Sequence, residues 1–538
     1  MWLRNLFFIG VLLSGIIGVR AALFPPPVPT HVKDFDAAPF EAGDFVTLVK
    51  KVDASIEAGI ARDGDLLQPA RRADDLTIAR RLHLALMGTI PSLQEIRQFE
   101  AYDGKQRLQW WLEGILRDRR SSDFLAERFA RVYVGTEDGP FIVFRRRRFV
   151  SWLAEEFANH RPYDQLVRNV IASEGLWTDK PATNFITVTV EQNQKNQPNP
   201  ERLAARVTRA FLGIRLDCAQ CHNHPFEEWK QTDFQGLAAY FGQTHQGFTG
   251  IHDGDGELRL ENRKTGEMQT IEPRVPFRPD LVPAEGTRRQ QLATWITHPQ
   301  NPYFARVTVN RIWALMFGRP MLAKVDDVSS IEEVPAALRL LADDFVAHQY
   351  DLRRLIRAIA ATQAFQRDSA ADHEITEKHE EAWAAFPLTR LRPEQVVGSV
   401  QQASSLTTLD ADTHILIRVM TLGARNDFIT RYGDIGEDEF ENRGGTIPQR
   451  LLLMNGELVH DRTKEGIFTA ATRIGWQAPD DQAAVRTAYL AVLTREPTPR
   501  EAAHFQNRLA GTTGNERSRR MEDMVWALIN STEFSWNH

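Results

Sequence analysis

The sequence predicts a mainly α-helical protein with two large helical regions. An irregular insertion, which is expected to contain minor β structure, joins them. Three observations support this fold class. Apolar residues recur at helical spacing over most of the chain, signals for helix starts recur with them, and residues 243–285 are instead rich in Gly, Pro and charged side chains. The chain has 538 residues, of which 42% are hydrophobic and 25% charged, so it can form sizeable buried cores.

The N-terminal residues have the pattern of an export signal. Arg4 precedes an apolar run from Leu6 to Val19, which has the length of a signal h-region and is short for a membrane span of roughly 20 residues. We expect residues 1–22 to be a signal peptide, or an uncleaved anchor if the residues after Arg20 lengthen the run. The Pro-rich residues 23–44 are expected to form an extended tether. The predicted location is therefore the periplasm or cell envelope.

The first helical region is expected at residues 45–242. Asp74 can cap a helix, and Ser92 with Glu95 forms a capping box before Ile96. Asn199-Pro200 marks another start, because proline at the first helical position loses no needed N–H. The apolar residues that then share one face of this helix are Leu203, Val207, Ala210, Phe211 and Ile214.

Evidence for strands is sparse. Residues 185–190 read Phe-Ile-Thr-Val-Thr-Val, and this β-branched stretch favours a strand. Residues 243–285 are expected to be a linker or a small irregular β insertion, and they mark the main boundary between the two regions.

The second helical region is expected at residues 286–538 and begins near Arg288. Thr498 and Glu501 form another capping box around Pro499. The last helix presents an apolar stripe of Met524, Val525, Leu528 and Ile529.

The two cysteines of the chain, Cys218 and Cys221, lie in the segment Cys-Ala-Gln-Cys-His-Asn-His-Pro-Phe. A disulfide framework would need more cysteines spread along the chain, so this spacing indicates local chemistry. Three alternatives to a cofactor stay open here: a local disulfide, a zinc site that also uses His224, and a redox-active dithiol.

The sequence Cys-x-x-Cys-His is the attachment signature of c-type haem. Two thiols three positions apart can form thioethers with the two vinyl groups of one porphyrin, and the following imidazole can bind the iron. We therefore predict one covalent haem c, held by Cys218 and Cys221, with His222 as the proximal iron ligand.

The same segment, continued through residue 241, resembles the planctomycete-type secreted cytochrome domain. Stretches of the second region resemble the domain of unknown function that follows it in that family: residues 301–313 with 317–319, 325–327, 350–352, 452–456 and 526–534. The resemblance implies this domain order, export and haem, and it implies no reaction. Relatives carry a His shortly after the Trp of Asn-Arg-x-Trp, whereas this chain has Leu315 and Met316 there.

The sixth iron ligand decides the class of haem protein, because Met or His gives an electron carrier and an open position allows a small molecule to bind. Met316 is the distal candidate, although packing between Trp313 and Phe317 also accounts for it. The alternative ligands are His224, His245, His252 and Met268.

Our first functional hypothesis is single-electron transfer with an envelope redox partner or a co-exported protein. The second is a haem enzyme with an open distal site that acts on a small molecule. The third is a non-haem envelope scaffold or polysaccharide-binding protein with a local disulfide. The net charge of -6 gives no reason to expect nucleic acid as a partner, and a membrane contact is expected only through the N-terminal segment. Walker, Rossmann, Gly-x-Ser-x-Gly and His-Glu-x-x-His motifs are absent from the sequence.

Overall fold

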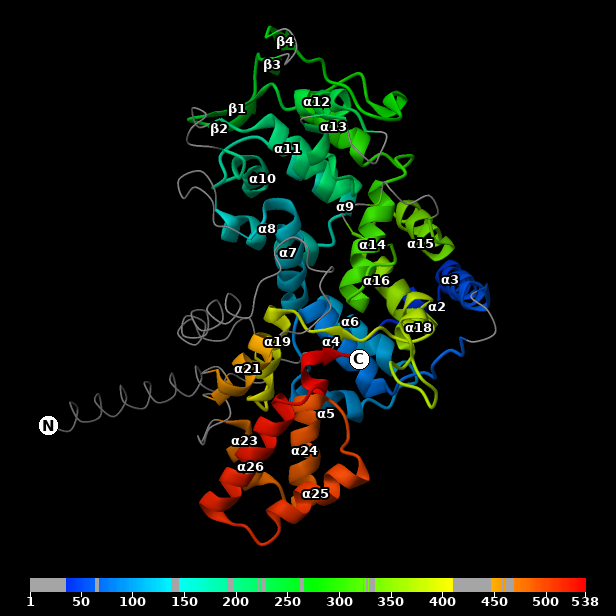
Figure 1. Cartoon of the computed structure of the whole chain (residues 1–538), viewed down its shortest axis with the longest axis vertical. Coiled ribbons are helices and arrows are strands. Elements are labelled where there is room, and N and C mark those ends of the chain that lie inside the picture. Colours follow the sequence, from blue (N-terminus) through cyan, green and yellow to red (C-terminus); the bar gives the residue numbers. More distant parts are fainter. Residues whose placement is uncertain are drawn as a thin grey trace, which may run out of the picture.

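A computed structural model of the chain confirms the mainly α-helical fold (Figure 1). The described residues are 35–62, 67–136, 145–190, 197–220, 222–223, 229–261, 266–322, 324–325, 328, 334–409, 447–456, 459–460 and 469–538. The predicted signal segment 1–22 lies outside them, as does most of the predicted tether. Within the described ranges, no helix has both the length and the apolar character that crossing a bilayer requires.

The helices up to the insertion form the upper and middle parts of the molecule in Figure 1. They are α2 (Ala38–Glu41), α3 (Gly43–Arg62), α4 (Asp75–Met87), α5 (Leu93–Ala101), α6 (Arg107–Arg117), α7 (Arg119–Val134), α8 (Arg146–Ala158), α9 (Tyr163–Ala172), η1 (Pro181–Thr183), α10 (Asn184–Thr187), α11 (Pro200–Val207), η2 (Thr208–Leu212), η3 (Leu216–Gln220) and α12 (Gln231–Ala239).

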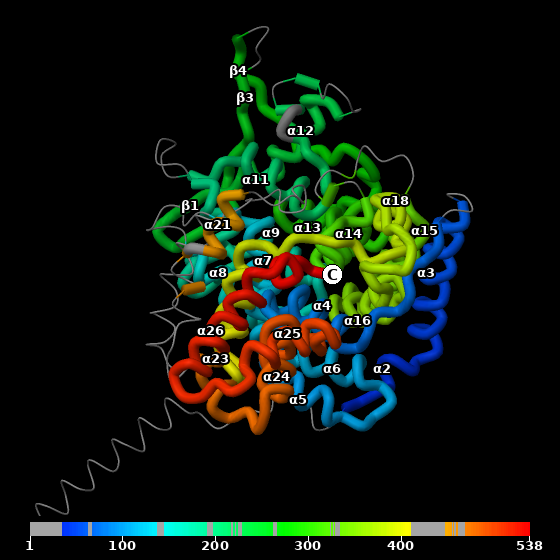
Figure 2. Tube along the Cα trace, turned by 60° about the horizontal axis from the view of Figure 1, so that its bottom comes forward, coloured from blue at the N-terminus to red at the C-terminus, as the bar shows by residue number. Residues whose placement is uncertain are grey.

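The later helices begin beside this region, and α23 to α26 form the lower part of the molecule in Figure 1, which is turned towards the viewer in Figure 2. They are η4 (Pro279–Leu281), α13 (Arg288–Ile296), α14 (Phe304–Phe317), α15 (Ala336–Ala347), α16 (Leu352–Ala361), α17 (Gln363–Gln366), α18 (Glu377–Glu381), α19 (Pro393–Ala403), α21 (Ile447–Asn455), α23 (Ala470–Gln477), α24 (Asp481–Leu493), α25 (Pro499–Leu509), α26 (Gly514–Ile529) and η5 (Glu533–Ser535).

The helix starts that the sequence predicts are confirmed by their caps. The Asp74 side chain accepts the Thr77 N–H at the start of α4. Capping boxes open α5 at Ser92 and α25 at Thr498, and Asn199 caps α11. These caps satisfy N–H groups that the first turn of a helix leaves without a partner, so local side-chain chemistry fixes where each helix begins.

The prediction of a strand at residues 185–190 is wrong. Residues 181–187 are helical, as η1 and α10. Phe185 and Ile186 are fully buried there, and the Asn184 side chain donates to the Pro181 main-chain oxygen and accepts the Arg145 N–H. Burial and these contacts outweigh the β-branched composition, which is a weak preference.

The insertion contains short β structure, as expected. Strand β1 (Thr244–Gly247) pairs antiparallel with β2 (Gly250–Asp253), and β3 (Arg259–Glu261) pairs with β4 (Met268–Thr270). Gly250 has φ of 101°, and a Cβ there would lie 2.2 Å from the backbone of Gly175. Glycine therefore allows this hairpin to dock against the loop after α9.

Two large hydrophobic cores hold the described residues together, and a small third cluster joins Leu93 and Ile96 of α5 to Leu490 and Ala491 of α24. The main core contains buried residues from Phe40 to Phe386 and is continuous across the insertion. The C-terminal core is formed from residues between Leu391 and Phe534, joined by Leu84 and Ile90 of the first region. The predicted domain limits at 242 and 286 stay a prediction, because a shared core does not mark where a sequence domain ends.

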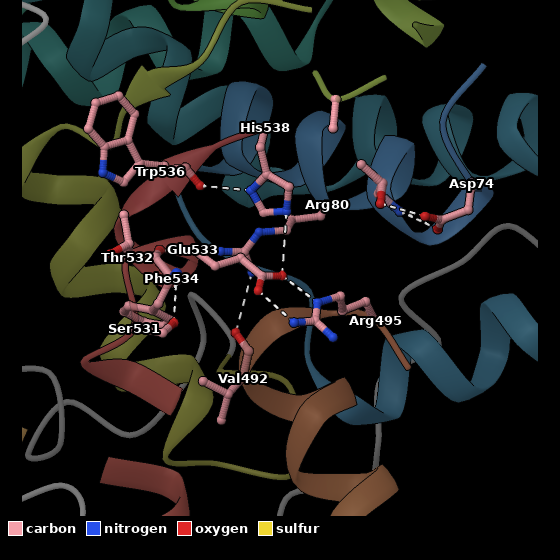
Figure 3. A network of polar contacts seen from close by, with 12 residues as sticks. Asp74, Arg80, Val492, Arg495, Ser531, Thr532, Glu533, Phe534, Trp536 and His538 are labelled. Atoms are coloured by element: carbon pink, nitrogen blue, oxygen red, sulfur yellow. Dashed lines mark hydrogen bonds and ion pairs between the residues drawn. The ribbon is translucent and has the colours of Figure 1, made fainter. Parts of the chain in front are cut away.

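Two buried arginines of α4, Arg80 and Arg81, connect the first region to the end of the chain, and Figure 3 shows Arg80 among the C-terminal residues. Arg80 donates to the main-chain oxygens of Val492 and Phe534, both at 3.3 Å. Arg81 donates to the main-chain oxygen of His538 at 2.7 Å. Next to them, β5 (Thr389–Arg390) pairs with β6 (Trp536–Asn537). The last residues of the chain are thus held in place because their main-chain oxygens accept hydrogen bonds from buried arginines.

Candidate haem-attachment segment

The segment that carries the cysteine motif begins with η3, which packs against α11 and α12. Leu216 and Ala219 are both fully buried. Residues three apart lie on the same side of a 3₁₀ helix, so these two side chains hold η3 against the main core. Gly213 precedes them with φ of 60°, and a Cβ on it would lie 2.7 Å from Val307 of α14. The segment therefore starts in close contact with the centre of the fold.

His222 is exposed, and its ring orientation is set by a local contact. Its Nδ1 lies 2.7 Å from the main-chain oxygen of Asn223. The Asn223 side chain accepts the Gln231 N–H at 3.0 Å, and Gln231 Nε2 donates to the Gln220 main-chain oxygen at 3.2 Å. These bonds connect Gln220, between the two cysteines, and Asn223, just after His222, to the first turn of α12.

The start of α12 is itself held in place. The Asp233 side chain accepts the Lys230 N–H at 2.9 Å and forms an ion pair with Arg274 at 3.2 Å. Trp229 is half-buried and packs near Phe277, with ring centres 6.4 Å apart. The support for His222 is therefore a folded helix end that a residue of the insertion also contacts.

Only part of the predicted cofactor site falls on described residues. Cys218 lies within η3, but its side chain is outside the description, as are Cys221 and His224. Across the described ranges, no group of three or more His, Cys, Asp or Glu side chains could hold a metal ion. The role of the two cysteines stays a prediction.

Met316 is fully buried in the last turn of α14. It follows Val307 by nine positions, which is about 13.5 Å along a helix axis. Trp313 and Phe317 beside it stack with ring centres 4.3 Å apart, and Trp383 and Phe386 pack on Phe317. Packing thus accounts for Met316, and its role as distal ligand stays a prediction.

The other distal candidates that are described lie in the insertion. His245 and His252 face each other across β1 and β2, with ring centres 6.1 Å apart, and Met268 on β4 is exposed. The structure therefore brings two of the candidates together and places them on a different element from Met316.

A buried tyrosine pair behind the segment is not evident from the sequence. The hydroxyls of Tyr133 and Tyr163 lie 2.6 Å apart, and the ring of Phe211 in η2 is 5.0 Å from that of Tyr133. Burial raises the pKa of both phenols above the ordinary range, so both stay protonated. The two residues come from α7 and α9, and no local pattern relates residues on separate helices.

The fold and this segment define a helical protein with two sequence domains in series. Residues 51–246 match the PSCyt2 family model, described as a protein of unknown function (DUF1549). Residues 288–416 match the PSD1 model, also described as a protein of unknown function (DUF1553). This is the two-domain arrangement that the resemblance implied, and neither description states an activity. No curated protein and no solved structure matches the chain.

Proposed function

We propose that this chain is an exported cell-envelope protein that carries one covalent haem c and transfers single electrons. Cys218 and Cys221 would hold the porphyrin through thioethers, and His222 would bind the iron from the proximal side. The motif Cys-x-x-Cys-His supports the cofactor, and the apolar residues 6–19 support export.

The observation that carries the proposal is the contact of His222 with Asn223. A main-chain oxygen can only accept, so at 2.7 Å the Nδ1 of His222 is the protonated nitrogen and donates. The lone pair of the imidazole is then on Nε2, which is the nitrogen left to bind iron. A hydrogen bond from the second nitrogen also orients a ligating ring and makes it more basic. The tautomer and orientation of His222 therefore support its proposed role as an iron ligand.

Residues around His222 would hold the proposed ligand in position. Leu216 and Ala219 hold η3 in the core, and Asn223 is fixed by the first turn of α12, so the ligand sits on a rigid support. When bound, haem supplies an iron that changes its charge by one electron at a potential tuned by ligands and solvent exposure. The exposure of His222 and Asn223 keeps this part of the surface accessible to an envelope redox partner or a co-exported protein.

A pyridine haemochrome spectrum tests the cofactor. The full chain is exported from a host with haem c maturation machinery, beside Cys218→Ala/Cys221→Ala and a control cytochrome. We expect a c-type spectrum that survives denaturation in the wild type and is absent from the variant. A colourless wild type, with the control cytochrome matured, would overturn the haem proposal and leave a disulfide or another metal at the cysteines.

A second measurement separates electron transfer from small-molecule chemistry. A carrier with both axial positions filled should show a reduced spectrum that carbon monoxide does not change. A clear shift on adding carbon monoxide would contradict the carrier and favour a haem enzyme with an open distal position.

A further inference from the structure

A cavity of about 500 Å³ lies between the start of α3 and the corner that joins α15 to α16, away from the haem-attachment segment. Figure 1 shows these three helices side by side, and α3 packs against both α15 and α16. The cavity lining combines apolar side chains, Phe45 and Pro162, with polar ones, His160, Arg354 and Arg357. The proposed function does not use this cavity.

Two helices end at the cavity with a polar residue in the left-handed conformation. His160 follows α8 with φ of 55°, and Gln349 follows α15 with φ of 56°. Glycine is usual at such a position, as Gly88 is after α4. A side chain there costs about 1–2 kcal/mol, and both of these residues line the cavity. Residues held in a costly conformation collect at ligand sites, so the two helix ends point to a bound molecule.

Two arginines of α16 are held in position by carboxylates outside the cavity lining. Asp344 accepts from both Nε and Nη2 of Arg354 at 2.9 Å, and Asp44 accepts from the same Nη2 at 2.8 Å. Glu113 accepts from Nε of Arg357 at 2.5 Å and from Nη2 at 3.3 Å. Within the described ranges, Nη1 of each arginine donates to no protein group and is not closed off from solvent. Each guanidinium therefore offers a donor that is already oriented and that a ligand can reach.

Positive charge is crowded at this end of the cavity. Burial first, and then Arg357, lowers the pKa of Arg353 to about 10. Partial burial, and then Arg353, lowers the pKa of His160. Asp351, which also lines the cavity, caps α16 by accepting the main-chain N–H groups of Arg353 and Arg354 at 2.8 and 3.1 Å. The negative charge of a ligand would relieve the repulsion among the cations.

We propose that this cavity binds one small organic acid, whose carboxylate is held by His160, Arg354 and Arg357. The two arginines are three positions apart on α16 and therefore neighbours on one face. A carboxylate has two oxygens, so it can accept from Nη1 of both arginines at once. Phe45 and Pro162 would contact its apolar body. The cavity volume is within the range of about 300–1,000 Å³ that is typical of small-molecule sites, and an inorganic ion would leave most of it unfilled.

Isothermal titration calorimetry of the full chain with benzoate tests the site, and benzamide is the uncharged probe of the same shape. We expect one benzoate site, with benzamide bound about tenfold or more weakly, because the amide lacks the charge that the arginines recognise. His160→Asn should weaken benzoate binding about threefold or more. Asparagine also adopts the left-handed conformation, so this variant should keep the end of α8 intact.

A substitution on α15 tests the position of the site. Ala347→Glu places a carboxylate in the cavity lining at an exposed residue and should abolish benzoate binding. Ala336→Glu is the matched control, because it makes the same change at the exposed first residue of α15, about 16.5 Å away along the helix axis. This control should bind benzoate as the wild type does.

The proposal is overturned if the wild type does not bind benzoate, or binds benzamide equally well. Unchanged benzoate binding in Ala347→Glu or in His160→Asn would place the site elsewhere and would also overturn it. Equal loss in Ala336→Glu would show a general effect of charge, with the same consequence. Inorganic phosphate that binds as tightly as benzoate would overturn the assignment of an organic acid and leave a simple anion site.

Discussion

Glu95 of α5 is a fully buried carboxylate whose charge we expect to stabilise the fold strongly. It accepts the Ser92 N–H at 2.7 Å and lies 2.6 Å from Nη2 of Arg120. Burial by itself raises the pKa of Glu95, but the charges of Arg120 and His83 outweigh burial and hold the pKa at about 2, below the ordinary 4.5. The folded state therefore favours the charged form.

The substitution Glu95→Gln removes the charge and keeps a carbonyl that can still accept the Ser92 N–H. A pKa difference of about 2.5 units at about 1.36 kcal/mol each gives a loss of about 3 kcal/mol in the free energy of unfolding at pH 7. Because the folded pKa lies below the unfolded one, this contribution is complete above about pH 5. It is lost as the pH falls towards 2, so the gap between wild type and variant should close over that range.

Urea unfolding followed by tryptophan fluorescence measures the difference in unfolding free energy between wild type and variant. Trp111 of α6 reports on this region because it packs on Phe99, which lies in α5 with Glu95, with ring centres 5.0 Å apart. Glu100→Gln is the control, because its ion pair with Arg486 has side chains 32% and 45% exposed. Exposed pairs contribute less than about 1 kcal/mol. The reasoning is refuted if Glu95→Gln costs no more than Glu100→Gln, or if its cost does not depend on pH.

Three further predictions concern the C-terminal residue His538, the tyrosine pair and the hairpin of β1 and β2. Burial first, and then Arg80, lowers the pKa of His538 to about 4, beside Glu533 in Figure 3. The unfolded state binds this proton first, so stability should fall from about pH 6.5 to 4, and His538→Gln should flatten that part of a thermal-unfolding profile against pH. Tyr163→Phe removes the hydroxyl partner of Tyr133 and should cost about 1–3 kcal/mol in urea unfolding; no loss would contradict the buried bond. Gly250→Ala should release the hairpin from Gly175, seen as faster amide exchange at Ile251, while an unchanged rate would contradict the close approach.

Local signals in the sequence were sufficient to predict much of the helical fold. Asp74, Ser92, Asn199 and Thr498 cap helices where the pattern placed them, and the insertion contains the expected short strands. A cap acts over three or four residues, so its chemistry can be inferred without knowing the rest of the fold. For the same reason, Cys-x-x-Cys-His is recognisable from the sequence alone.

The candidate site was predictable only in its motif. The sequence identifies His222, but the contact of its Nδ1 with Asn223 and the fixing of Asn223 by Gln231 depend on how the chain turns into α12. Met316 was a candidate ligand by residue type, whereas its full burial follows from packing against α14's neighbours. Residue type shows what a side chain can bind, and only position shows what it can reach.

By itself, the sequence determined the fold class, the helix starts and the haem motif, because each depends on residues that are close together in the chain. The tertiary structure decided that residues 184–187 are helical and where the two large cores divide. It also decided that Arg81 of α4 contacts the main chain of His538. These outcomes depend on burial and on contacts between residues that are far apart in the sequence. Such contacts form, and contribute to stability, only when the chain folds.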